Sequence, residues 1–227
     1  MRSIGIESEI SEIVKYVQEH GDTINEGSAS TKELMYLISL AKARSICLIG
    51  EIGFNAGFSS YAFLRANARA KVFSFDLGLH TYVGLAKEFI DRKFPGRHTL
   101  VLGDSRETLP AFQKSYPQLR FDLVFIDGGH EYRTALSDLT NMQPFCTNKT
   151  VVVMDDVLPW VAWGKGPNKA WKEAIRKGVI EQKELLKDGT RVRKITPPGS
   201  QAWARGRYIL AAQRKTRSLA RTFQSRK

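Results

Sequence analysis

Short apolar runs alternate with segments of helical spacing along most of the chain. The strand-like runs occupy residues 45–50, 71–76, 98–102, 121–126 and 150–154. Between them, apolar residues recur every three to four positions within 57–67, 81–93, 105–116 and 131–142. Strands that alternate with helices in this way form a parallel sheet covered by helices on both faces. The pattern therefore predicts an α/β fold with a doubly wound sheet.

Two helical segments precede the first of these strands. Apolar residues recur at helical spacing through 6–19. Further on, Ser30-x-x-Glu33 has the form of a capping box that opens a second helix through Ala43. We therefore expect two N-terminal helices before the sheet begins.

The last part of the chain is punctuated by Gly and Pro and has a different pattern. One amphipathic helix fits 168–178, and 179–185 and 207–212 are expected to pair antiparallel at the sheet edge. The predicted architecture is a mostly parallel, seven-stranded sheet with an antiparallel C-terminal edge hairpin.

Residues 48–60, LIGEIGFNAGFSS, join the first strand to the next helix. The glycines fall at Gly50, Gly53 and Gly57 with Glu51 between them, which differs from the GxGxxG fingerprint of dinucleotide binding. Glu51 would repel a pyrophosphate, whereas it suits a cationic ligand. In a parallel sheet, nucleoside-bearing cofactors bind at such a turn.

Acidic residues also follow the second and third strands. Asp76 is suited to accept hydrogen bonds from a ribose, although a surface carboxylate is the simpler interpretation. Gly103 then precedes Asp104 and Ser105, where either side chain could contact an adenine. Capping of the next helix explains these two residues nearly as well.

The ends of the fourth and fifth strands bring together more acidic residues. Asp127 and His130 follow the fourth strand, and Asp155 and Asp156 follow the fifth. Three neighbouring carboxylates repel one another unless one of them holds a proton or a cation neutralises them. Oxygen ligands suit Mg²⁺, Ca²⁺ or Mn²⁺ better than zinc. The sequence predicts a divalent cation here, with capping of the following turns by the two adjacent aspartates as the alternative.

These motifs resemble a known family. The pattern E-x-G-x-x-x-G resembles the first motif of class I S-adenosylmethionine-dependent methyltransferases. The phrases EIGFNAGFSS, FDLVFIDGGHEY and VVVMDD most resemble the branch called methyltransferase domain 24, which includes sugar O-methyltransferases. Asp127, Asp155 and Asp156 match the metal triad of cation-dependent small-molecule O-methyltransferases. The resemblance extends from about Gly27 to Asp156 and implies a Rossmann-like fold, with S-adenosyl-L-methionine and Mg²⁺ or another divalent cation as cofactors.

The resemblance also implies roles for individual residues. The turn after the first strand would line the methionine and ribose side of the cofactor, Asp76 would hold the ribose hydroxyls, and Asp104 and Ser105 would face the adenine. The implied cofactor-binding residues are Gly27, Glu51, Gly53, Phe54, Asn55, Gly57, Ser59, Asp76, Leu77, Gly103, Asp104, Ser105 and Asp127.

His130 is the candidate general base, with Asp127 beside it as the second catalytic residue. A histidine near its ordinary pKa of about 6.5 can take a proton from a hydroxyl whose acidity a cation has raised. Capping of the helix at 131 is the alternative role of this histidine. The acceptor is expected at 159–171, where Trp160 and Trp163 lie among Pro and Gly and are therefore expected to be exposed.

Charge is distributed unevenly along the 227 residues. Residues 1–160 carry 17 Lys and Arg against 19 Asp and Glu, whereas 161–227 carry 18 against 4. This basic excess is typical of a surface for an anionic partner. We expect a single catalytic domain over 1–213 and a basic, disordered tail over 214–227.

No apolar run approaches the roughly 18 residues of a membrane helix, so a cytoplasmic enzyme without a membrane span is expected. The acceptor is predicted to be a hydroxylated small molecule, such as a sugar or polyphenol. Two alternatives stay open: a nucleic-acid ribose methyltransferase that uses the basic C-terminal third, and a hydroxylase-like relative of the same fold. The oligomeric state is also open, a homo-oligomer included.

Overall fold

The structure is a computed structural model that describes residues 4–26 and 29–210. Within these residues, eight strands form one sheet in the order β3-β2-β1-β4-β5-β8-β6-β7. The strands are β1 (Leu48–Ile52), β2 (Lys71–Asp76), β3 (His98–Leu102), β4 (Phe121–Ile126), β5 (Cys146–Met154), β6 (Ile180–Lys187), β7 (Thr190–Val192) and β8 (Ala202–Tyr208). The strands β1 to β5 pair in parallel, and β8 joins β5 and β6 antiparallel.

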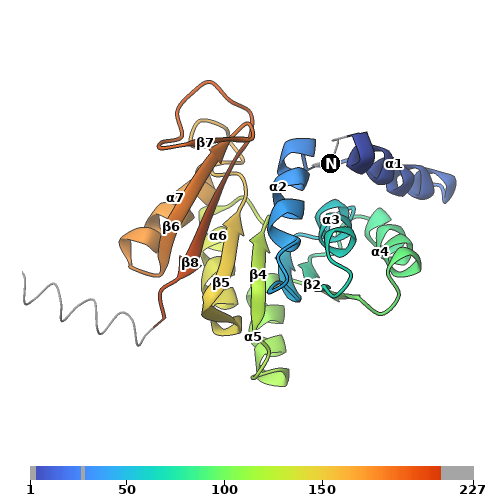
Figure 1. The fold of residues 1–227 in the computed structure, drawn as a ribbon, viewed down its shortest axis with the longest axis horizontal. Coiled ribbons are helices and arrows are strands. Elements are labelled where there is room, and N and C mark those ends of the chain that lie inside the picture. The colour runs from blue at the N-terminus through green and yellow to red at the C-terminus, as the bar shows by residue number, and fades with distance from the viewer. Residues whose placement is uncertain (1–3, 27–28, 211–227) are drawn as a thin grey trace, which may run out of the picture.

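Helices cover both faces of this sheet (Figure 1). They are α1 (Ile4–Glu19), α2 (Thr31–Ala41), α3 (Phe58–Ala66), α4 (Tyr82–Lys93), α5 (Ser105–Ser115), α6 (Tyr132–Met142) and α7 (Lys165–Arg176), with a short 3₁₀ helix, η1 (Gln143–Phe145). Leu123 and Phe125 of β4 pack in one core cluster with α1 to α4, whereas Val124 and Ile126 pack in a second with α5 to α7. Successive side chains of a strand point to opposite faces, so one buried strand supplies both cores.

The predicted α/β architecture with a doubly wound, mostly parallel sheet is confirmed. The sheet has eight strands rather than seven because β7 forms a short hairpin with β6 that the pattern did not predict. The last strand was also expected too late, at 207–212, whereas it occupies Ala202–Tyr208. Arg205 interrupts its apolar pattern, yet this side chain is held by an ion pair with Glu184 at 2.7 Å.

The capping box of α2 forms as predicted. Ser30 Oγ accepts a hydrogen bond from Glu33 N at 3.2 Å, and the Ser30 backbone N–H donates back to the Glu33 carboxyl group. This arrangement fixes the first turn of α2, which faces the carboxyl edge of the sheet.

The proposed tail at 214–227 lies outside the described residues, and the domain boundary at 213 stays a prediction. Across 4–26 and 29–210, none of the helices combines the length and the apolar content that a membrane crossing requires.

Candidate active site

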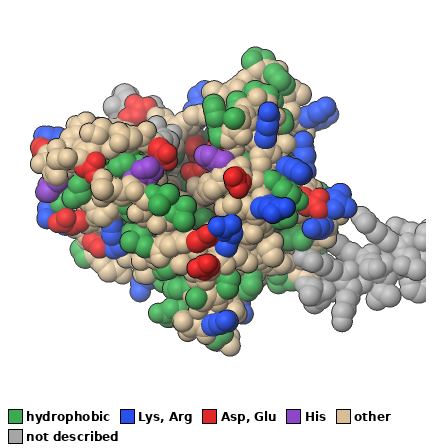
Figure 2. All heavy atoms as spheres, turned by 180° about the vertical axis from the view of Figure 1, so that it is seen from behind, with side chains coloured by type: hydrophobic (Ala, Val, Ile, Leu, Met, Phe, Trp, Pro, Cys, Tyr) green, Lys and Arg blue, Asp and Glu red, His purple; other side chains and the backbone are tan. Residues whose placement is uncertain are grey.

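A cavity of about 780 Å³ runs along the carboxyl edge of the parallel strands. The sheet order places the turn after β1 in its middle, the ends of β2 and β3 on one side, and those of β4 and β5 on the other. Figure 2 shows acidic and histidine side chains gathered around this hollow. The predicted site residues that line it are Gly53, Phe54, Asn55, Ser59, Asp76, Leu77, Gly103, Asp104, Ser105, Asp127, His130, Asp155 and Asp156.

The turn after β1 is held by backbone amides that point to Asp76. Phe54 N and Asn55 N both donate to Asp76 Oδ2 at 2.9 Å, and Gly78 N donates to Oδ1 at 2.7 Å. The carboxylate therefore ties the end of β2 to the turn. Its predicted contact with ribose hydroxyls stays a prediction, since three backbone amides already use part of its accepting capacity.

Glu51 lies elsewhere than expected. The side chain is fully buried below the turn and does not line the cavity. Ser60 Oγ and Ser74 Oγ each donate to Glu51 Oε2 at 2.5 Å. Burial raises the pKa of Glu51 to about 7. The geometry thus gives Glu51 a structural position beneath the site in place of the direct cofactor contact that the sequence suggested.

Among the described residues, one predicted cofactor-binding glycine, Gly57, also does not line the cavity. Gly57 precedes α3 with φ of 75° and packs against the Phe54 ring, so it shapes the turn from behind. Gly27 lies outside the described residues.

At the end of β3, Asp104 and Ser105 both have partners within the protein. Asp104 caps α5 by accepting from Arg106 N at 2.9 Å, and it forms an ion pair with the Arg106 guanidinium. This contact lowers the pKa of Asp104 to about 2. Ser105 Oγ donates to Asp138 Oδ1 at 2.6 Å. The capping alternative is therefore correct for Asp104, while an adenine contact of either residue stays a prediction.

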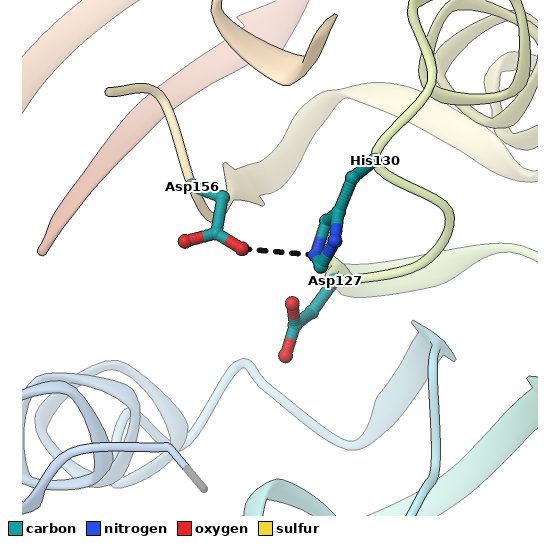
Figure 3. A group of neighbouring side chains, drawn as sticks. All are labelled: Asp127, His130 and Asp156. Atoms are coloured by element: carbon teal, nitrogen blue, oxygen red, sulfur yellow. Dashed lines mark ion pairs between the residues drawn. The ribbon is translucent and has the colours of Figure 1, made fainter. Parts of the chain in front are cut away.

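Asp127, His130 and Asp156 form a compact cluster on the other side of the turn (Figure 3). One ligand atom of each lies within 4.8 Å of the others. His130 Nε2 lies 3.0 Å from Asp156 Oδ2. The N-cap position of α6 is Glu131, without a side-chain capping bond, so the capping alternative for His130 is wrong. Asp156 has φ of 57°, a left-handed backbone that costs energy for a residue with a side chain. Such strain is typical of functional sites.

Electrostatics in this cluster favours an added positive charge. Burial, and then the negative charge of Asp156, raise the pKa of Asp127 to about 7. The hydrogen bond to Asp156 raises the pKa of His130 above its ordinary value. The two half-buried carboxyl groups are oxygen donors that fit Mg²⁺ or Mn²⁺, and the His130 imidazole lies beside them.

Asp155 differs from its expected place in a metal triad. Its carboxyl group lies within hydrogen-bonding reach of Glu33, a residue of α2 that the sequence indicated only as a helix cap. Burial, and then the negative charge of Glu33, raise the pKa of Asp155. The cluster of three ligand atoms thus contains His130 where the sequence placed Asp155.

The tryptophans expected at the acceptor side divide between two environments. Trp163 lines the cavity and is 49% exposed. Trp160 is half-buried, packs on the second core cluster and donates to Gly199 O at 3.2 Å, so its expected exposure is wrong. Ser200 and Gln201 also line the cavity, although no sequence motif marks them.

The fold and this strand-edge site are similar to those of class I S-adenosylmethionine-dependent methyltransferases. A family model described as "Methyltransferase domain" matches residues 51–157, which include the turn, the cluster and both aspartates after β5. No curated protein is matched by its sequence.

Solved structures of methyltransferases share the fold over most of the chain. An O-methyltransferase from Bacillus cereus in complex with SAH has a TM-score of 0.69 at 15% identity, with 88% of this chain and 90% of that chain covered. TomG from Streptomyces achromogenes, an O-methyltransferase of tomaymycin synthesis, has a TM-score of 0.67 at 16% identity and coverage of 88% and 89%. CalS11, a TDP-rhamnose 3'-O-methyltransferase, has a TM-score of 0.57 at 18% identity and coverage of 87% and 93%.

Proposed function

We propose that this chain is an O-methyltransferase that depends on a divalent cation and acts on a hydroxyl group of a small molecule, such as a sugar or a polyphenol. The observation that carries the proposal is the Asp127–His130–Asp156 cluster beside the turn after β1. Similarity of fold to O-methyltransferases, among them a sugar-modifying one, supports the same reaction.

The cavity offers suitable surfaces for both cofactors. Leu77 and Leu79 are exposed apolar side chains that line its β2 side, where an adenine would be covered. Asp127 and Asp156 would hold the cation on the β4–β5 side. When bound, S-adenosylmethionine supplies an electrophilic methyl group, and the cation supplies positive charge that makes a hydroxyl more acidic.

His130 would take the proton from the acceptor. In the neutral ring, Nε2–H donates to Asp156 Oδ2, which leaves the lone pair of Nδ1 as the proton acceptor. The half-exposed ring can pass this proton on to solvent. Trp163 at the cavity wall would cover one face of the acceptor ring. Positioning by these side chains would supply most of the rate.

Methyl transfer from labelled S-adenosylmethionine to a library of hydroxylated acceptors tests the proposal. We expect transfer to oxygen that stops in a chelator and returns with added Mg²⁺ or Mn²⁺. Asp127→Asn is expected to lose the activity, whereas Asp91→Asn, on α4 away from the cavity, is the matched control. Undiminished transfer in chelator would contradict the role of the cation.

The nucleic-acid alternative uses the basic C-terminal third, whose tail at 214–227 lies outside the described residues, and it stays a prediction. Salt-sensitive RNA or DNA binding that is lost when this tail is deleted would support it. The hydroxylase-like alternative would be supported by hydroxylation of an acceptor without methyl transfer. The cytoplasmic location and the oligomeric state also stay predictions.

A further inference from the structure

Glu33 presents one carboxyl oxygen that the helix cap does not explain. The side chain is 4% exposed and lines the cavity. The carboxyl group accepts from the Ser30 backbone in the capping box, yet no donor of the described residues reaches the buried Oε1 atom. A buried acceptor without a donor costs about 1–3 kcal/mol. Among the described residues, the side chain in hydrogen-bonding reach is that of Asp155, a carboxyl group that cannot donate while both carboxyl groups are ionised.

Asp155 stands opposite Glu33 and brings a second carboxyl group to the same place. The end of β5 is fixed there because Asp155 N donates to Ile126 O at 3.0 Å. The neighbouring side-chain charges that act on Asp155 are those of Glu33, Asp127 and Asp156, all of them negative. Two carboxyl groups thus meet in the cavity wall without a basic side chain between them.

Outside the proposed cation site, the other acidic residues of the cavity wall differ because each has a partner in the protein. Glu26 Oε2 lies 3.0 Å from His80 Nε2, and Asp104 pairs with Arg106. Asp76 accepts from backbone amides. The general acidity of the cavity wall therefore does not explain why the carboxyl groups of Glu33 and Asp155 lie together.

A ligand group that fits the pair must carry hydrogen-bond donors and positive charge. A primary ammonium group has three donors and no acceptor, so it can satisfy Glu33 Oε1 and Asp155 together. A phosphate or carboxylate at the same place would add negative charge to four acidic side chains. Asp155 adjoins Asp156 in the chain, so a group held here stands next to the proposed cation site.

We propose that Glu33 and Asp155 form an acceptor subsite for a protonated amino group, so that the enzyme selects amino-bearing hydroxyl compounds over neutral or anionic ones. The subsite rests on the proposed function, since it names the acceptor class of that site. Glu33 and Asp155 would thus determine acceptor specificity, in addition to the site residues that the resemblance to methyltransferases implies.

Binding can be measured without methyl transfer, by calorimetry on the full chain with S-adenosylhomocysteine and Mg²⁺. The probes are dopamine, 4-methylcatechol and 3,4-dihydroxyphenylacetate, which share the ring and both hydroxyls and differ in charge. Glucosamine, glucose and glucuronate form a second series. We expect the ammonium probe of each series to bind roughly 10- to 100-fold more tightly than its neutral counterpart, and the carboxylate probe to bind most weakly.

Glu33→Gln is expected to remove this preference, and glutamine keeps the capping box so that α2 can form. Asp155→Asn is the second variant and should have the same effect. Glu26→Gln, on the same cavity wall but paired with His80, should keep the preference.

Equal affinity of the ammonium and neutral probes in the wild-type protein would overturn the subsite, as would no measurable binding of dopamine and glucosamine. A preference that survives in both Glu33→Gln and Asp155→Asn would also overturn it. The proposed function fails separately: ammonium-selective binding without methyl transfer contradicts only the function, and transfer to neutral acceptors without charge preference contradicts only the subsite.

Discussion

Gly53 and the carbonyl oxygen of Asp127 are in such close contact that a β-carbon at residue 53 would lie 1.9 Å from this oxygen. Gly53 also has φ of 90°, which residues with side chains rarely adopt. The turn after β1 and the end of β4 can therefore approach each other only with glycine at this position. This contact places the proposed cofactor turn directly against the backbone of Asp127, the residue whose carboxylate would hold the cation.

Gly53→Ala is expected to disrupt both the cofactor turn after β1 and the proposed cation site at the end of β4. The added methyl group must displace backbone rather than a flexible side chain, so we expect a loss of about 3–5 kcal/mol in the free energy of unfolding. Binding of S-adenosylhomocysteine, measured by calorimetry, should be lost. Urea unfolding measures the stability.

Gly96→Ala separates the cost of the left-handed backbone from the cost of the contact with Asp127. Gly96 has φ of 68°, but a β-carbon at this residue would have nothing within 4 Å. We expect a cost of only about 1–2 kcal/mol from the left-handed backbone, with cofactor binding kept. Similar costs of the two substitutions would show that the contact with Asp127 is unimportant.

Local patterns predicted the parallel sheet because each buried strand forms a continuous apolar run, as in FDLVFI before Asp127. The same pattern placed Asp76, Asp127 and Asp156 at one edge, since parallel strands end together. The strand β8, which lies between β5 and β6, was placed too late because Arg205 breaks its apolar pattern, and an ion pair with Glu184 holds this arginine in the strand.

The direction of side chains at the site could not be predicted in the same way. Glu51 is one residue of a strand whose alternate positions point to opposite faces, and the sequence did not show that Ser60 and Ser74 would enclose it. The pairing of Asp155 with Glu33 joins segments far apart in the chain. Such contacts depend on how α2 packs, which no local motif encodes.

Asp155 and Asp156 are adjacent, yet we expect them to differ in cation binding. Asp156 belongs to the cluster with Asp127 and His130, whereas Asp155 faces Glu33. Asp156→Asn should weaken Mn²⁺ binding by about 100-fold or more, and Asp155→Asn by less than about 10-fold. Electron paramagnetic resonance of free Mn²⁺ gives both affinities. Equal losses would restore the triad that the sequence suggested.

Trp163 is expected to serve the acceptor rather than the fold. It is 49% exposed in the cavity wall, so Trp163→Ala should change the free energy of unfolding by less than about 0.5 kcal/mol. The KM for the acceptor should rise about 2- to 10-fold through loss of ring contact. Trp171→Ala is the contrasting variant, because this side chain is 2% exposed and its loss should cost about 3–5 kcal/mol. An unchanged KM in Trp163→Ala would contradict the acceptor role.

The buried network around Glu51 predicts how stability changes with pH. Burial raises the pKa of Glu51 to about 7 from 4.5 in the unfolded chain. Between these values the folded protein holds a proton that the unfolded chain has lost, so the free energy of unfolding falls as pH rises. Burial lowers the pKa of His98, which contacts Ser74, to about 3, and this histidine acts in the opposite direction from about pH 3 to 6.5.

Comparing Glu51→Gln with the wild type at each pH removes the contribution of His98, which both proteins share. Relative to the variant, the wild type should lose about 3 kcal/mol of unfolding free energy between pH 4.5 and 7, and the difference should then stay constant above about pH 8. Urea unfolding across this range measures it, with Glu107→Gln on the exposed face of α5 as the control. A difference that does not change with pH would mean that Glu51 is already ionised in the folded protein. The serine hydroxyls would then satisfy a buried carboxylate, and the strand would tolerate its charge without a proton.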